Sequence, residues 1–158
     1  MIVKGSTRCM DEVARFAASY SGAWKSGHFT ADVYAAAPDQ VSKTPRSGEY
    51  VGKGGFIVRG ERTWYRNVPL GIAIGVQEDP VIRVIGGPPS AIRGRARIRV
   101  TLQPGQFEPN DVARKVVRIL KERLGDEGAR EARAVLRTEA VAALVPPGGS
   151  DVGEDHEG

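Results

Sequence analysis

Apolar residues recur at helical spacing near both ends of the chain. In the stretch 9–27 they return every three or four positions, acidic residues occupy the first turn, and Gly27 follows the last one. This pattern is typical of an amphipathic helix. A stripe of valine and leucine within residues 110–125 predicts a second helix that stops at Gly125. Two shorter helical pieces are predicted at about 127–136 and after Thr138.

Short apolar and β-branched runs lie between these helices. The runs ADVYAAA, GFIVRG, PLGIAIGVQ and VIRVIGG are separated by turn residues, including the tripeptide EDP, and predict strands. The order of helix, strands and then helices favours an α+β fold with an N-terminal helix, a mostly antiparallel β-sheet and C-terminal helices. The length of 158 residues suits one domain, at 1–150, and the acidic residues 151–158 are expected to form a disordered tail.

The run AIRGRARIRV, residues 91–100, carries four arginines at alternate positions. Alternate side chains of an extended strand point to opposite faces of a sheet, so Arg93, Arg95, Arg97 and Arg99 would share one face. That face can be the solvated side of a half-buried edge strand. The lack of any acid within the run favours a bound ligand to the same degree.

The chain is more basic than its formal net charge of +4 indicates. Four of its 19 acids lie in 151–158, so residues 1–150 carry 23 lysines and arginines against 15 acids, a net charge of +8. This balance favours a polyanionic partner such as nucleic acid. No apolar run approaches the about 20 residues of a membrane span, and the single cysteine cannot form an internal disulfide. We therefore expect a cytoplasmic protein with no membrane contact.

Residues suited to catalysis or to metal binding are few. Two histidines and one cysteine do not make a zinc site. In VGKGG, Gly54 stands where a phosphate-binding P-loop needs serine or threonine. His28 has no nucleophile elbow near it. We expect no metal, no cofactor and no enzymatic activity.

Binding chemistry concentrates in residues 40–60, QVSKTPRSGEYVGKGGFIVRG, and just beyond them. Its glycines allow backbone N–H groups to approach phosphates closely, because no Cβ intervenes. Aromatic residues alternate with the cations, which suits looped or single-stranded RNA, whose bases stack while its phosphates pair. Phe56 and Trp64 are expected in the core, whereas Tyr50 and Tyr65 fit the core and an RNA surface about equally. The candidate RNA-binding residues are Lys43, Arg46, Tyr50, Lys53, Arg59, Arg62, Arg66, Arg95, Arg97 and Arg99.

The same segment resembles the NFACT RNA-binding domain, NFACT-R, of the fibronectin-binding protein A-like and nuclear export mediator factor family. Residues 40–44, 48–50 and 55–60 are similar to that family's runs Gln-Val-Ser-Lys-Thr, Gly-Glu-Tyr and Gly-Ser-Phe-Ile-Ile-Arg-Gly. FAASYSGAW, at 16–24, is similar to its Phe-Ala-Ala-x-Tyr-Ser-x-Ala-Trp helix, and NVPLGIAIGV and VIGGPPSAI resemble archaeal members.

The resemblance implies a part in the rescue of obstructed translation. Members of the family bind the large ribosomal subunit that carries a stranded peptidyl-tRNA, engage tRNA, and promote template-free extension of the stalled chain. The ribosome performs the peptide chemistry. The expected partners are therefore RNA, as tRNA or the large ribosomal subunit.

The resemblance also implies that MIVKG closes a half-domain whose first part is missing. Ile2 and Val3 would then lie at a sheet edge that pairs with a second chain or with a second copy of this one. The alternative to an RNA-binding domain is accordingly a protein-interaction module, half of a split factor.

Overall fold

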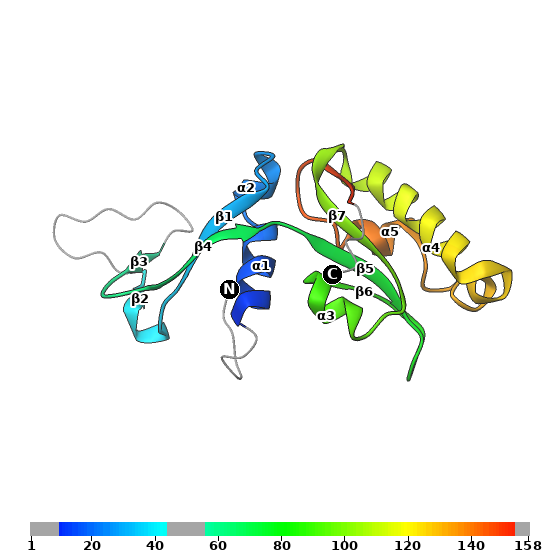
Figure 1. Ribbon diagram of the computed structural model, residues 1–158, viewed down its shortest axis with the longest axis horizontal. Helices are drawn as coiled ribbons and strands as arrows, with labels where there is room; N and C mark the ends of the chain where they lie inside the picture. The colour runs from blue at the N-terminus through cyan, green and yellow to red at the C-terminus, as the bar shows by residue number, and fades with distance from the viewer. Residues whose placement is uncertain (1–9, 44–55, 154–158) are drawn as a thin grey trace.

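The computed structural model describes residues 10–43 and 56–153. The helices are α1 (Met10–Ser19), α2 (Gly22–Lys25), a short 3-10 helix (Pro38–Gln40), α3 (Pro89–Arg93), α4 (Pro109–Glu131) and α5 (Thr138–Ala142). The strands are β1 (Thr30–Ala35), β2 (Val41–Ser42), β3 (Ile57–Val58), β4 (Thr63–Pro69), β5 (Ile72–Gln77), β6 (Arg83–Gly87), β7 (Ile98–Phe107) and β8 (Ser150–Val152). The molecule is elongated, and this order of elements confirms the predicted α+β fold (Figure 1).

The N-terminal half is a two-stranded ribbon backed by a helix. β1 and β4 pair antiparallel, with Tyr34 opposite Trp64. Exposed and half-buried residues alternate along β1, because successive side chains of a strand point to opposite faces. The half-buried face, with Val33 and Tyr65, packs with α1 into the main core. The other face is open to solvent.

The C-terminal half is an antiparallel sheet with strand order β6-β5-β7-β8, with α4 and α5 on one face and α3 on the other. β5 is buried on both faces. Ile72 and Ile74 join the core that α4 and α5 cover, whereas Ala73 packs with Ile92 of α3 on the opposite face. At Gly75 an added Cβ would lie 2.7 Å from the Cβ of Ala96, so this close approach requires glycine.

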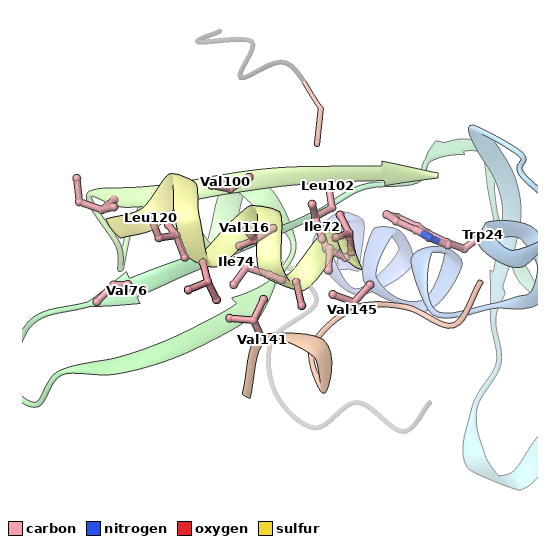
Figure 2. Packing of buried hydrophobic residues seen from close by; sticks show 14 of the residues in the cluster. Trp24, Ile72, Ile74, Val76, Val100, Leu102, Val116, Leu120, Val141 and Val145 are labelled. Carbon is pink, nitrogen blue, oxygen red and sulfur yellow. The ribbon is translucent and has the colours of Figure 1, made fainter. Parts of the chain in front are cut away.

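Trp24 joins the two halves. Its side chain is fully buried at one end of the main core (Figure 2). Its indole N–H donates to the Ser150 hydroxyl at 3.0 Å. Nearby, the Tyr20 hydroxyl donates to the carbonyl of Leu144, and the Ser19 hydroxyl accepts the backbone N–H of Gly71 at 3.0 Å. The run FAASYSGAW therefore has a structural role, because it ties α1 and α2 to the C-terminal half.

The single helix predicted over 9–27 is two helices in the structure. α1 ends at Ser19 and α2 begins at Gly22. Ser21 lies between them, and its hydroxyl accepts the backbone N–H of Ala23 at 3.2 Å, as an N-cap does. The break turns Trp24 toward Ser150.

The interpretation of 91–100 as an extended strand does not hold in the first half of the run. Residues up to Arg93 form α3, which has proline at its first position, where the fixed φ of proline favours a helix. Ile92 and Ala96 then bury at helical spacing against Ala73. Of the four arginines only Arg99 lies within β7, so they do not share one strand face.

The disordered tail was predicted to begin at residue 151, which is too early. Asp151 and Val152 belong to β8 and pair with Gln103 and Leu102 of β7. The Asp151 carboxylate also lies 3.2 Å from the Lys115 ammonium group. Residues 154–158 and the predicted edge residues Ile2 and Val3 lie outside the described residues.

Candidate nucleic-acid interface

Gln40 fixes the two chain segments that flank residues 44–55. Its side-chain oxygen accepts the N–H of Ala37 at 2.8 Å, and its amide nitrogen donates to the carbonyls of Arg59 at 3.0 Å and Glu61 at 2.6 Å. Gly60 has a φ of 84°, and a Cβ there would lie 2.8 Å from the Gln40 amide nitrogen. The positive φ favours glycine, and a larger residue would also displace the Gln40 amide. Gln40 and Gly60, which belong to the run that resembles NFACT-R, therefore hold the local backbone conformation.

Lys43 and Phe56 lie next to each other at the ends of the same segment. The Lys43 ammonium group stands 5.0 Å from the centre of the Phe56 ring. The placement of Phe56 in the core was wrong, because 58% of its surface is exposed. The ladder between β2 and β3 pairs only two residues from each strand, which is too short to bury an aromatic side chain.

The solvent face of the β1–β4 ribbon carries two aromatic rings and two guanidinium groups. Tyr34 and Trp64 stand opposite each other with their ring centres 5.2 Å apart, close to edge-to-face. The Arg62 guanidinium lies over the Tyr34 ring at 4.7 Å, and the Arg66 guanidinium over the Trp64 ring at 4.1 Å. We call these four residues the aromatic–arginine face.

The placement of Trp64 in the core was also wrong. Its exposed fraction is 45%, whereas the adjacent Tyr65 is half-buried against the core. Successive residues of β4 point to opposite faces, and α1 covers only the face that Tyr65 occupies. Burial of Tyr65 therefore sends Trp64, with Arg62 and Arg66, to the solvent side.

Asp32 holds Arg66 in place on this face. Its carboxylate accepts the backbone N–H of Asn67 at 2.9 Å and a guanidinium N–H of Arg66 at 3.0 Å. The Asn67 hydrogen bond, and after it the contact with Arg66, lowers the pKa of Asp32 below its usual value. Asp32 is therefore ionised at neutral pH, and it anchors the guanidinium that covers Trp64.

The remaining predicted residues do not form one surface. Arg46, Tyr50 and Lys53 lie outside the described residues. Arg59 follows β3 and is half-buried, and its backbone carbonyl accepts the Gln40 side-chain amide. Arg62 is also tied to this region, because it donates to the Val58 carbonyl at 3.1 Å.

The arginines around the start of β7 belong to the other half of the molecule. Figure 1 shows β7 and the β2–β3 pair on opposite sides of α1. Arg95 is exposed, Arg97 pairs with Glu78 at 3.2 Å, and the Arg99 guanidinium donates to the Ala96 carbonyl at 3.4 Å. The run 91–100 contains no acid, and Arg97 instead pairs with Glu78, which directly follows β5.

Sequence reasoning missed the two aromatic residues of the aromatic–arginine face. The run RTWYRNV carried a signal for Trp64, because Arg62, Trp64 and Arg66 occupy alternate positions in it. Tyr34 had no comparable signal, because only its pairing across the ribbon brings it beside Trp64.

In the described part of the chain, no group of three or more His, Cys, Asp or Glu side chains is placed to hold a metal ion. No helix there is long and apolar enough to cross a membrane.

An α+β domain that exposes aromatic rings among arginines on a strand face has the surface chemistry of a single-stranded nucleic-acid-binding domain. Residues 3–60 match the family described as the NFACT protein RNA binding domain, which confirms the resemblance noted in the sequence. The chain is also 38% identical over 144 residues to the archaeal Rqc2 homolog aRqcH of Methanocaldococcus jannaschii. That match covers 90% of this chain and 20% of the relative, so the chain spans about one fifth of the relative's length. No solved structure matches the chain.

Proposed function

We propose that this chain is a non-catalytic RNA-binding domain that acts in ribosome-associated quality control in the cytoplasm, where it contacts tRNA or the large ribosomal subunit. The observation that carries the proposal is the match of residues 3–60 to an RNA-binding domain. The similarity to an archaeal Rqc2 homolog supports the process. The domain holds its RNA, and the ribosome supplies the chemistry.

The described residues support RNA binding through two neighbouring features. Gln40 joins the flanks of the basic, glycine-rich segment 44–55, and the aromatic–arginine face continues from them along β4. Arg62 belongs to both features, because it donates to the Val58 carbonyl and covers Tyr34. Cations beside exposed rings suit a ligand that offers both phosphates and bases.

The proposal predicts that tRNA binding weakens steeply as salt rises. Each phosphate that a lysine or arginine neutralises releases counterions, with a slope of about −0.7 to −0.9 in log K against log salt. Four contacts would lower the affinity by about 50- to 150-fold between 50 and 200 mM salt. Fluorescence anisotropy of labelled tRNA at several salt concentrations measures the slope.

Polyglutamate of similar charge is the control for that titration. It should bind more weakly than tRNA, because it has no bases to stack. Absence of tRNA binding at low salt, or an affinity indifferent to salt, would contradict the proposal.

A second candidate function, association through a sheet edge, is supported by one observation. Among the described strands, β1 pairs only with β4, so its other edge has no strand partner there. A hollow of about 220 Å³ borders β1 and α1, with Ala17, Ala31 and Val33 in its wall. An unpaired edge beside small side chains suits an added strand.

If that edge binds a second copy, the weight-average mass should rise with protein concentration in sedimentation equilibrium. Ala17→Glu, which places a charge in the hollow, should shift the curve toward the monomer. Ala140→Glu, at an exposed position of α5, is the matched control and should leave the curve unchanged. A monomer at all concentrations would exclude self-association through this edge.

A further inference from the structure

The aromatic–arginine face leaves two large rings in water. Tyr34 is 40% and Trp64 45% exposed, although the main core lies directly behind the same strands. A cross-strand aromatic pair does stabilise a two-stranded ribbon. Aliphatic β-branched pairs serve that purpose as well, and they need no guanidinium groups beside them. The arrangement therefore suits a ligand that contacts ring faces and cations together.

The two arginines flank the rings in a fixed pattern. Arg66 lies two residues after Trp64 within β4, so strand periodicity places both on one face. Arg62 lies just before β4, and its contact with the Tyr34 ring places it on the same side. Their guanidinium planes cover the two rings at 4.7 Å and 4.1 Å. The face thus presents exposed ring surface and planar guanidinium groups side by side, and both can stack on a nucleobase.

Arg66 is held ready for such stacking by groups outside the face. Asp32 accepts its N–H at 3.0 Å and is itself held by the backbone N–H of Asn67. Asn67 has a φ of 51°, so the chain turns there to present its N–H to the carboxylate. A guanidinium fixed in this way keeps other N–H groups for a phosphate oxygen, because a guanidinium has five donors.

We infer that the aromatic–arginine face stacks unpaired nucleobases, so that the domain prefers single-stranded or looped RNA to a continuous duplex. This inference rests on the proposed function and names the kind of RNA that this face takes. Bases inside a duplex are stacked on one another and offer no free surface, whereas bases of a loop or single strand do. Arg62 and Arg66 supply the positive charge for the flanking phosphates. Asp32 is a positioning residue that acts through Arg66.

The test compares a single-stranded oligouridylate with a blunt-ended RNA duplex that has the same number of phosphates. Charge density alone favours the duplex, so tighter binding of the single strand reports stacking. The chain has two tryptophans, and Trp24 is fully buried. Quenching of tryptophan fluorescence by the single strand therefore reports Trp64.

Trp64→Ala should weaken single-strand binding by about 5- to 150-fold, the range that one lost base stack produces, and should leave duplex binding unchanged. Trp64→Phe should keep most of the affinity and lose the quenching, because phenylalanine still stacks. Phe107→Ala is the matched control, since Phe107 is an exposed ring with the Lys115 ammonium at 5.0 Å in the other half of the molecule. It should change neither signal.

Two outcomes would overturn the inference in different ways. Equal salt-dependent binding of both RNAs, unaffected by Trp64→Ala in folded protein, would leave the proposed function standing and assign the face to ribbon stability or to a protein partner. Failure of both RNAs and of tRNA to bind at low salt would overturn the proposed function as well. Circular dichroism of each variant confirms that the comparison is between folded proteins.

Discussion

Trp24→Ala is expected to lower the free energy of unfolding by about 3–5 kcal/mol, the usual effect of removing a fully buried tryptophan side chain. The indole fills one end of the main core and donates to the Ser150 hydroxyl. The substitution leaves a cavity and removes a partner from that buried hydroxyl. Small domains have free energies of unfolding of only about 5–15 kcal/mol. This one change should therefore strongly lower the urea concentration at the midpoint of unfolding.

Trp64→Ala provides the comparison within the same chain. Trp64 is 45% exposed and packs mainly against Tyr34 and Arg66, so we expect its removal to cost about 1 kcal/mol or less. Urea denaturation followed by circular dichroism measures both variants. Equal effects of the two substitutions would contradict the role of Trp24 as the link between the halves.

The quadruple variant Lys43→Ala, Arg46→Ala, Lys53→Ala and Arg59→Ala is expected to lose most of its tRNA affinity. If each side chain neutralises one phosphate, the slope of log K against log salt should fall by about 3–4. If these cations serve RNA binding and not the fold, the melting temperature should change little, because substitutions away from structural contacts usually alter stability by no more than about 0.5 kcal/mol. The two measurements are tRNA anisotropy across salt concentrations and a thermal melt.

The matched control removes the same charge from the C-terminal half. It replaces Arg118, Lys121, Arg130 and Arg133, which are exposed on or just after α4, and should lower the slope by clearly less. A quadruple variant in 43–59 that melts far lower, yet binds tRNA unchanged per folded molecule, would show that those cations are structural.

Local patterns predicted the elements whose burial is one-sided. The α4 stripe was correct, and Gly125, with a φ of 75°, interrupts the helical backbone at the predicted stop, although α4 resumes beyond it and continues to Glu131. The strand predicted from ADVYAAA is β1. In these elements the period of the apolar residues matches the geometry of the helix or strand, so the sequence alone is sufficient.

The arginines of 91–100 show where a pattern with period two fails. Their alternation fits a strand, but the prolines before Ser90 start a helix, and Ile92 and Ala96 bury against Ala73 from a strand about 20 residues earlier. That contact is long-range, and no window of the sequence contains it. The tail was misjudged for the same reason, because β8 is ordered by pairing with β7.

The α+β class, the basic character of residues 40–60 and the resemblance to an RNA-binding family could all be read from the amino-acid sequence. These depend on composition, local periodicity and runs of adjacent residues. The three-dimensional contacts were needed to show that Gln40 and Gly60 hold the local backbone. They were also needed to show that Trp64 is exposed while Tyr65 is half-buried. Which face of β4 is covered depends on where α1 packs, and which ring stands beside Trp64 depends on the pairing with β1. Both are contacts between residues far apart in the chain, and their free energies are set by the whole fold.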